Sequence, residues 1–497
     1  MKRAYLGFLR DRAALTIAML LAVRVIVLVL GPGIINGDGI LYAKAAQYVA
    51  QTGLAPPASF QSRTYSVLIA PLVALLGEAG RQPIESHARH AIGGAVHLLQ
   101  VLLDLGVVLV LLRVFAAMRP RNRRAYGAGV AVIALQPITA CWTNFLVPDT
   151  IATAGIVIGL CLVARSAGES IAWRRLAAGS FLCGISGLVR IDMAVLAVAV
   201  LAVWLLVVFW PRGIIATARG VGVSAVLFLV PILAMGAYQY GSQGSVRYID
   251  AAAGDNPSVR KPGYFAWTRA WVTTPGEFKT FILGAESGPD WHGYDASKYP
   301  ARAFATPRDR AAAAPAFAAW KQGGYTPAVD AVLTDASARL RRAHPVQPWL
   351  AGALRTTQLW VNPDGGAALV QGLWLRPPSS KVVAAGTTVL KALLGLLALL
   401  GIWLTLRAVR RSPRSAFSDY PMAFAVLAVL TLAFRWIEMF VLNLTIGGAA
   451  MESRYVIETW PGLIVLAGLG WRALADRFLQ RSAQIPATAV DTQEVVL

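Results

Sequence analysis

Several runs of more than about 18 residues in this chain are almost free of charge, long enough to cross about 30 Å of hydrocarbon as helices. The chain has 497 residues, of which 57% are hydrophobic and 14% charged. Its mean hydropathy is +0.57. One soluble core of this size could not enclose so much apolar surface, because soluble chains divide into domains at smaller sizes. We therefore expect an all-α polytopic membrane protein.

The net charge of +21 has a topological meaning in such a chain. Much of the excess lies in short arginine clusters beside the apolar runs, as the positive-inside pattern requires. We expect no nucleic-acid partner, because no basic stripe carries interleaved aromatic residues. The clusters expected in the cytoplasm are "KRAYLGFLRDR" at the N-terminus, then 119–124, 165–175, 407–414 and 472–481.

Keeping every cluster on one side requires an even number of crossings between clusters, which predicts ten spans with both termini in the cytoplasm. Residues 64–77 are apolar but short and contain Pro71, so we expect them to lie at the outer interface or to re-enter the membrane. The expected spans are 13–31, 91–114, 125–143, 148–164, two short spans within 177–210 that turn at Arg190–Asp192, 220–240, 385–406, 417–441 and 455–473.

This topology divides the chain into four parts. Residues 1–240 form an N-terminal membrane module, whose first outer loop covers about 32–90 and includes interfacial helices. Residues 241–384 are less hydrophobic and rich in aromatic side chains, so we expect an outer domain or elaborated loop there. Residues 385–481 hold the last spans, and 482–497 form a cytoplasmic tail that we expect to be disordered.

The unusual polar residues of the chain fall on the outer side in this topology. Charged groups are costly near a bilayer, so their convergence on one face indicates a shared polar cavity. The candidates are Asp38, Tyr42, Lys44, Arg63, Asp149, Arg190, Asp192, Arg435, Glu438, Glu452, Arg454 and Tyr455.

Such a cavity fits a reaction between a lipid-anchored anionic donor and an acceptor outside the membrane. A donor phosphate would be bound by arginine, whose planar fork matches phosphate oxygens, with Arg63, Arg190 and Arg454 as candidates. The acceptor hydroxyl or amine needs a carboxylate that takes its proton, and Asp38 is the candidate general base. Asp38 could also simply cap a helix that ends at Gly53.

Five segments, taken in order, carry a family resemblance. They are "GDGILYAKAAQYVAQTG" with "RTYSVLIAPLVALLG", "ALQPITACWTNFLVPDTIATAGIVIGL", "GISGLVRIDMAVL", "AHPVQPWLAGALRTTQLW" and "ESRYVIETWPGLIVLAGLG". Together they resemble the GT-C superfamily of membrane glycosyltransferases, in the branch of the protein O-mannosyltransferases and lipid A aminoarabinose transferases.

The resemblance implies an inverting glycosyltransferase that uses a polyprenyl-phosphate sugar donor and a lipid, glycan or protein acceptor. It implies transfer on the periplasmic or lumenal side of the membrane. The Ala- and Arg-rich composition favours a bacterium, so we expect a bacterial inner membrane with the site facing the periplasm. Asp38 then matches the catalytic base and Asp149 a second acid, while Arg63 and Arg454 match basic residues near the donor phosphate. Asp38 is followed by Gly39 where many members have a second acid, which weakens the case for a divalent metal. The sequence indicates no particular cofactor, and whether a divalent metal is needed stays open.

Other readings of these residues stay open at this point. Asp149 can cap the fourth span, Arg190 and Asp192 can close a turn, and Arg435 can pair with Glu438. A transporter or flippase for a lipid-linked sugar is one functional alternative. A polymerase or ligase that uses a diphosphate-linked donor is another.

Overall fold

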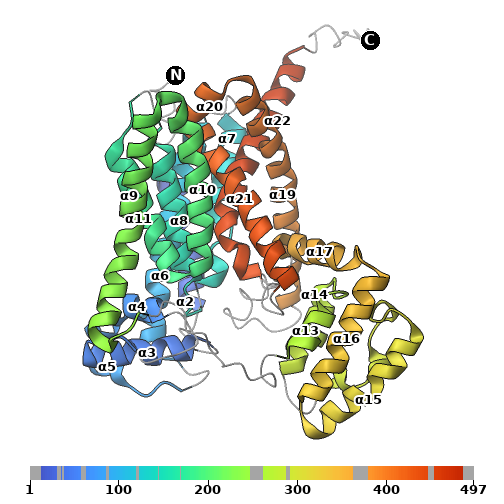
Figure 1. The fold of residues 1–497 in the computed structure, drawn as a ribbon. Helices are drawn as coiled ribbons and strands as arrows, with labels where there is room; N and C mark the ends of the chain where they lie inside the picture. The colour runs from blue at the N-terminus through green and yellow to red at the C-terminus, as the bar shows by residue number, and fades with distance from the viewer. Residues whose placement is uncertain are drawn as a thin grey trace, which may run out of the picture.

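The computed structural model describes most of the chain, and its described residues form helices and no strand. The described residues are 13–30, 35, 38–56, 63–85, 89–118, 123–143, 145–167, 170–246, 261–286, 291–361, 379–445 and 453–484. Figure 1 shows a bundle of long helices with a smaller helical domain beside one of its ends.

The bundle consists of long apolar helices that run back and forth along one axis (Figure 1). They are α2 (Ala13–Leu30), α6 (Ala91–Ala117), α7 (Arg123–Leu135), α8 (Asp149–Ala164), α9 (Trp173–Val189), α10 (Ile191–Phe209), α11 (Ile214–Gln243), α19 (Ser379–Arg411), α21 (Tyr420–Thr445) and α22 (Trp460–Gln484). Short helices η1 (Ala140–Trp142), η2 (Trp210–Arg212), α20 (Pro413–Ser418) and η9 (Ser453–Thr459) connect some of them.

Five helices in the described part of the chain are long and apolar enough to cross a membrane, which makes this an integral membrane protein. They are Ala91–Ala117, Ile191–Arg212, Ile214–Gln243, Ala385–Arg411 and Tyr420–Thr445. Shorter apolar helices cover Leu15–Val29, Thr64–Leu75, Ala125–Leu135 and Asp149–Ala164. These four helices are too short to cross about 30 Å of hydrocarbon by their length alone.

Two expected boundaries have clear outcomes. The predicted break within 177–210 is confirmed, since α9 ends at Val189, Arg190 is extended, and α10 begins at Ile191. The prediction of one continuous span over 125–143 is wrong, because α7 ends at Leu135. Pro137 disfavours helical geometry in the residue before it. The side chain of Gln136 instead accepts a hydrogen bond from the backbone N–H of Thr139.

The arginine-rich segments gather at one end of the bundle. The guanidinium of Arg165, after α8, lies 5.2 Å from the ring centre of Tyr420 at the start of α21. Arg212, before α11, donates to the carbonyl of Ala167. Trp471 in α22 donates to the carbonyl of Ala125 at the start of α7. We call this the basic end.

The opposite end carries α3 (Asp38–Thr52), α4 (Arg63–Leu75) and α5 (Glu78–Arg81) (Figure 1). Gly53 ends α3 with φ +71°, and its N–H donates to the carbonyl of Val49, as expected for a helix C-terminus. Tyr238, near the end of α11, donates to the carbonyl of Gly53. These contacts fix α3 and α4 on the end away from the arginine-rich segments, which we call the site end.

The smaller domain also lies at the site end and has its own hydrophobic core. Its helices are α13 (Pro262–Thr268), α14 (Pro275–Glu277), the π-helix η3 (Phe278–Leu283), η4 (Gly284–Glu286), η5 (His292–Tyr294), η6 (Ala296–Lys298), η7 (Ala301–Ala303), α15 (Pro307–Gly323), α16 (Pro327–Ala343) and α17 (Gln347–Val361). Aromatic rings dominate the core, with Trp267 and Tyr264 fully buried. Many of the aromatic residues that mark 241–384 in the sequence are therefore core residues.

A buried arginine joins this smaller domain, which corresponds to the predicted outer domain and keeps that name below, to the bundle. Arg355 of α17 donates to the carbonyls of Arg269 and Val272 after α13, at 2.9 and 2.5 Å. It also donates to the carbonyl of Asn443 in α21, at 2.8 Å. Burial and the nearby charge of Arg269 lower the pKa of Arg355 to about 10, so the group stays charged at neutral pH.

Glycines let the bundle helices approach one another closely. A Cβ on Gly401 of α19 would lie 1.9 Å from the carbonyl oxygen of Leu466 in α22, and one on Gly470 would lie 2.2 Å from that of Leu397. Small residues at such contacts are a general device of helix packing in membranes.

Gly401→Val should separate α19 from α22. We expect a loss of about 1–3 kcal/mol in the free energy of unfolding, measured by SDS-induced unfolding in mixed micelles. Gly395→Val on the same helix is the matched control, because no atom lies within 4 Å of its added Cβ. Equal effects of the two substitutions would contradict the packing argument.

Candidate functional site

The turn between α9 and α10 brings Arg190 to two carboxylates. Its Nη1 donates to Asp149 Oδ1 at 2.5 Å, and its Nε donates to Asp192 Oδ1 at 3.1 Å. Its Nη2 donates to the other oxygen of Asp192, which completes a bidentate pair. Asp149 lies in the first turn of α8, where the helix dipole favours negative charge.

Arg435 of α21 continues this pairing. Its Nη2 donates to Asp192 at 2.8 Å, and its Nη1 donates to Glu438 at 2.7 Å. Its Nε lies 2.6 Å from Glu458 of η9, within ion-pair distance, although neither oxygen of Glu458 has a partner in hydrogen-bond geometry. We call Asp149, Arg190, Asp192, Arg435, Glu438 and Glu458 the carboxylate–arginine network.

The network is closed on one side and accessible on the other. The side chains of Arg435 and Glu458 are 0% and 1% exposed, whereas those of Asp192 and Glu438 are 20% and 16% exposed. Two guanidinium groups thus lie among four carboxylates, so the described members carry more acids than bases. Desolvating such charges is costly, and removing one partner leaves another buried charge uncompensated.

A pair of tyrosines connects the network with α3. The ring of Tyr65 in α4 meets that of Tyr42 in α3 edge to face, with centres 4.9 Å apart. Gln100 of α6 donates to the Tyr65 hydroxyl at 3.2 Å and to the carbonyl of Val147, two residues before Asp149, at 2.9 Å. Tyr65 therefore lies between the helix that begins at Asp38 and the start of α8.

Burial keeps the Tyr65 hydroxyl neutral. Burial raises the pKa of the Tyr65 hydroxyl well above its ordinary value, and the neighbouring Tyr42 and Asp149 raise it further. The hydrogen bond with Gln100 lowers this pKa by a smaller amount. The group is then available as a hydrogen-bond donor at every physiological pH.

Asp38 is the first residue of α3 and is partly exposed. The neighbouring Gly39 is buried, and a Cβ there would lie 3.2 Å from the carbonyl oxygen of Leu146. The segment before Asp149 thus packs directly on the start of α3. Of the other predicted residues in this loop, Tyr42 is buried and Lys44 is exposed.

Three predicted phosphate-binding or substrate-binding residues are placed by their backbone alone. Arg63 is the first residue of α4, two residues before Tyr65. Arg454 and Tyr455 belong to η9, a few residues before Glu458. The side chains of these three, and all of Glu452, lie outside the described residues. Arg63 thus begins the helix that carries Tyr65, and Arg454 and Tyr455 belong to the helix that carries Glu458.

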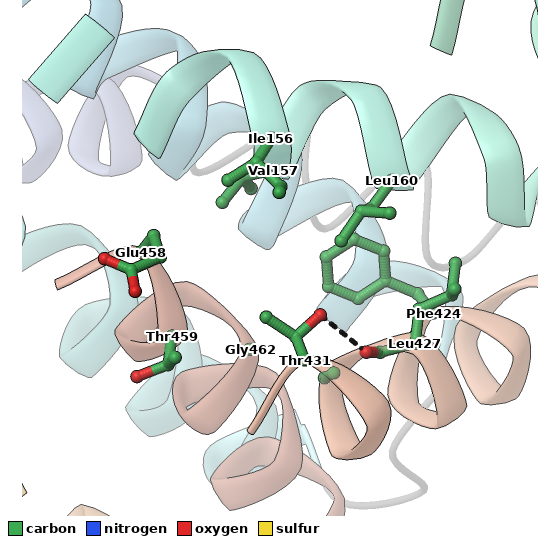
Figure 2. Close-up of a pocket in the computed structure, with 10 residues that line it drawn as sticks. Ile156, Val157, Leu160, Phe424, Leu427, Thr431, Glu458, Thr459 and Gly462 are labelled. Atoms are coloured by element: carbon green, nitrogen blue, oxygen red, sulfur yellow. Dashed lines mark hydrogen bonds between the residues drawn. The ribbon is translucent and has the colours of Figure 1, made fainter. Parts of the chain in front are cut away.

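A small cavity lies next to Glu458, between α8, α21 and the start of α22 (Figure 2). Its volume is about 20 Å³, which is enough for one water molecule. Its walls are apolar except for Glu458, Thr459 and Thr431, and the Thr431 hydroxyl donates to the carbonyl of Leu427 at 2.8 Å. The cavity therefore borders the network at Glu458, on the buried side.

No cluster of three or more His, Cys, Asp or Glu side chains among the described residues has the geometry to hold a metal ion. The clustered carboxylates of the network face guanidinium groups instead.

Three residues of this site were not identified from the sequence: Glu458, Tyr65 and Gln100. Glu458 carried a usable signal, since it is an acid inside the expected span 455–473. Gln100 is also polar within an expected span, while Tyr65 stands in an apolar loop segment where an aromatic residue is ordinary.

No protein-family model, curated protein or solved structure matches the chain.

Arg435→Gln should destabilise the protein strongly, because it leaves Asp192, Glu438 and Glu458 without their shared cation. We expect a loss of about 3–5 kcal/mol in the free energy of unfolding, measured by SDS-induced unfolding. Adding Glu458→Gln should recover part of this loss by removing one buried acid. The exposed Arg410→Gln on α19 is the control and should change little. A small effect of Arg435→Gln would show that the network is not coupled to folding.

Proposed function

We propose that this chain is an inverting GT-C-type membrane glycosyltransferase that moves a sugar from a polyprenyl-phosphate donor to a lipid, glycan or protein acceptor. Asp38 is the general base. The proposed topology has ten spans, both termini in the cytoplasm, and the site end facing the periplasm of a bacterial inner membrane.

The observation that carries the proposal is the position of Asp38 relative to the network. Asp38 begins a helix at the site end, Gly39 packs on the segment before Asp149, and Tyr65 connects the two regions. A base that serves both a lipid headgroup and a water-borne acceptor must be near the membrane surface and partly exposed. Asp38 is partly exposed at the start of α3, and in the proposed topology the site end lies at the membrane surface.

The proposed step is a single displacement. An acceptor oxygen or nitrogen attacks the anomeric carbon, and its proton passes to the Asp38 carboxylate. The bond from the anomeric carbon to the phosphate oxygen breaks, and polyprenyl phosphate leaves with the bonding electron pair. Cations beside that phosphate stabilise the charge that develops on it, a role suited to Arg63 and Arg454, in the helices that carry Tyr65 and Glu458.

The contacts favour a different role for Arg190 than phosphate binding. All three of its nitrogens already donate to carboxylates, so a phosphate would have to displace Asp149 or Asp192. We assign Arg190 and Asp192 as positioning residues that hold Asp149 at the start of α8. Asp149 is itself buried and paired, which suits a residue that orients the site.

The ten-span topology draws on the position of the arginine-rich segments. Contacts among α7, α8, α9, α11, α21 and α22 gather these segments at the basic end. Positive residues favour the cytoplasmic side. The site end, with Asp38 and the outer domain, is then on the far side of the membrane.

One observation favours the alternative function of a transporter or flippase. Arg24 of α2 and Asp104 of α6 form a buried ion pair at 2.9 Å, well inside the bundle. Ionisable residues inside a membrane often mark substrate pathways. The contact of Arg24 with the carbonyl of Ala134 in α7 equally fits a structural role. Radiolabelled donor in proteoliposomes separates the functions, since movement without bond formation would indicate transport.

A matched pair of donors distinguishes the second alternative. Monophosphate-linked and diphosphate-linked sugars are supplied in parallel to the purified protein. Transfer from the monophosphate donor alone supports the proposal, and transfer from the diphosphate donor alone indicates a polymerase or ligase.

Asp38→Asn should lower the rate of sugar transfer by about 10²- to 10⁴-fold, because the amide cannot accept the acceptor proton. The measurement is transfer of radiolabelled sugar by purified protein in detergent. Glu78→Gln, an exposed acid-to-amide change on α5 at the same end, is the control and should keep full activity. Full activity of Asp38→Asn would rule out the assigned base.

A further inference from the structure

Helix α17 exposes an apolar stripe on the side that does not pack against the protein. Its buried face includes Ala351, Arg355 and Leu359. On the other face, Trp349 and Leu350 are each 58% exposed. The full stripe, at helical spacing, is Val346, Trp349, Leu350 and Leu354. In water such a stripe would be unfavourable, so a partner of apolar character covers it.

The stripe continues a surface that faces lipid. The ring of Trp349 lies 6.1 Å from that of Phe440 in α21, centre to centre. Beside Phe440, Ile437 and Val441 are exposed on the same helix, one of the five long enough to cross a membrane. Figure 1 shows α17 beside the bundle near α19 and α21, roughly perpendicular to the bundle axis, which is the orientation of a helix in the interface plane.

The exposed apolar side chains described in the outer domain lie on this side. Among the side chains that the structure describes in 261–286 and 291–345, no large hydrophobic one is exposed. The described apolar exposure of the domain begins at Val346, just before α17. A bilayer explains this asymmetry without a second protein.

Two exposed arginines flank the start of the stripe. Arg341 and Arg342, at the end of α16, donate to the backbone carbonyls of Ala266 and Ala338. Neither contacts a carboxylate within the described part of the chain, so both charges are available. They lie a few residues before Val346. Basic residues beside an interfacial helix attract the phosphates of anionic lipids.

We propose that α17 and the end of α16 form a membrane-docking surface. The stripe of α17 lies in the acyl boundary of the bilayer, and Arg341 and Arg342 bind the phosphates of anionic lipids. Docking fixes the outer domain at a set height above the site end, through α17 and Arg355. This inference does not depend on the proposed glycosyltransferase activity.

The first test uses a nitroxide at Leu350→Cys in full-length protein reconstituted in vesicles, with Cys141, Cys161 and Cys183 replaced by alanine. Labels at Ile437→Cys, facing lipid, and Ala319→Cys, exposed on α15, are the references. We expect position 350 to collide mainly with oxygen, as at 437, and position 319 mainly with a water-soluble nickel chelate. A label at 350 that favours the chelate would overturn the docking surface. One shielded from both reagents would show that protein covers it, and would also overturn it.

The second test asks whether anionic headgroups gather at the arginines. A fluorophore at Leu350→Cys is exposed to doxyl lipids with phosphatidylglycerol or phosphatidylcholine headgroups at equal mole fraction. We expect the anionic quencher to act roughly two- to fivefold more strongly, since each basic residue near the surface favours anionic lipid. Arg341→Gln/Arg342→Gln should abolish this preference.

The matched control removes two exposed charges from α15, in Arg308→Gln/Lys321→Gln, and should keep the preference. An absent preference in the unmodified protein, or an equal loss in both double variants, would overturn the assignment of headgroups to Arg341 and Arg342. The reference label at position 437 reports in every variant whether the bundle is still inserted.

Discussion

Two guanidinium groups buried among four carboxylates hold together the site end of this protein. Arg190 joins α8 to α10, and Arg435 joins α10 to α21 and η9. These contacts are between elements far apart in the chain, so the network can form only when the bundle is complete. Its charges are costly to desolvate, and their value lies in fixing one arrangement of the helices rather than in stability alone.

Glycine contacts deeper in the bundle make this arrangement possible. Gly159 of α8 and Gly179 of α9 each lie where an added Cβ would approach the other's carbonyl oxygen, at 2.8 and 2.6 Å. Gly184 of α9 similarly leaves no room for a side chain against the carbonyl oxygen of Phe228 in α11. Backbones this close bring Asp149 and Arg190 into reach of each other at the ends of α8 and α9.

The sequence predicted the helical class, the break at Arg190, and the polar character of the residues that form the network. Hydrophobic runs and Gly53 are local signals, so these features could be found from the chain alone. The end of α7 was missed, although Pro137 was visible, because the apolar run continues beyond it. The pairing of Arg435 with Asp192 and Glu458 could not be found, because it depends on which helices are neighbours. The aromatic core of the outer domain was invisible for the same reason.

The position of Arg355 has a mechanical consequence. The Arg355 guanidinium donates hydrogen bonds to carbonyls of the outer domain and of α21 at the same time. Its partner in α21, Asn443, is about two helical turns from Arg435. Hydrogen bonds to a charged group each contribute about 1.5–3 kcal/mol, so these bonds together hold the outer domain to α21. Any displacement of this domain would therefore act on α21 at Asn443, about two turns from the ion pairs of Arg435 within the same helix.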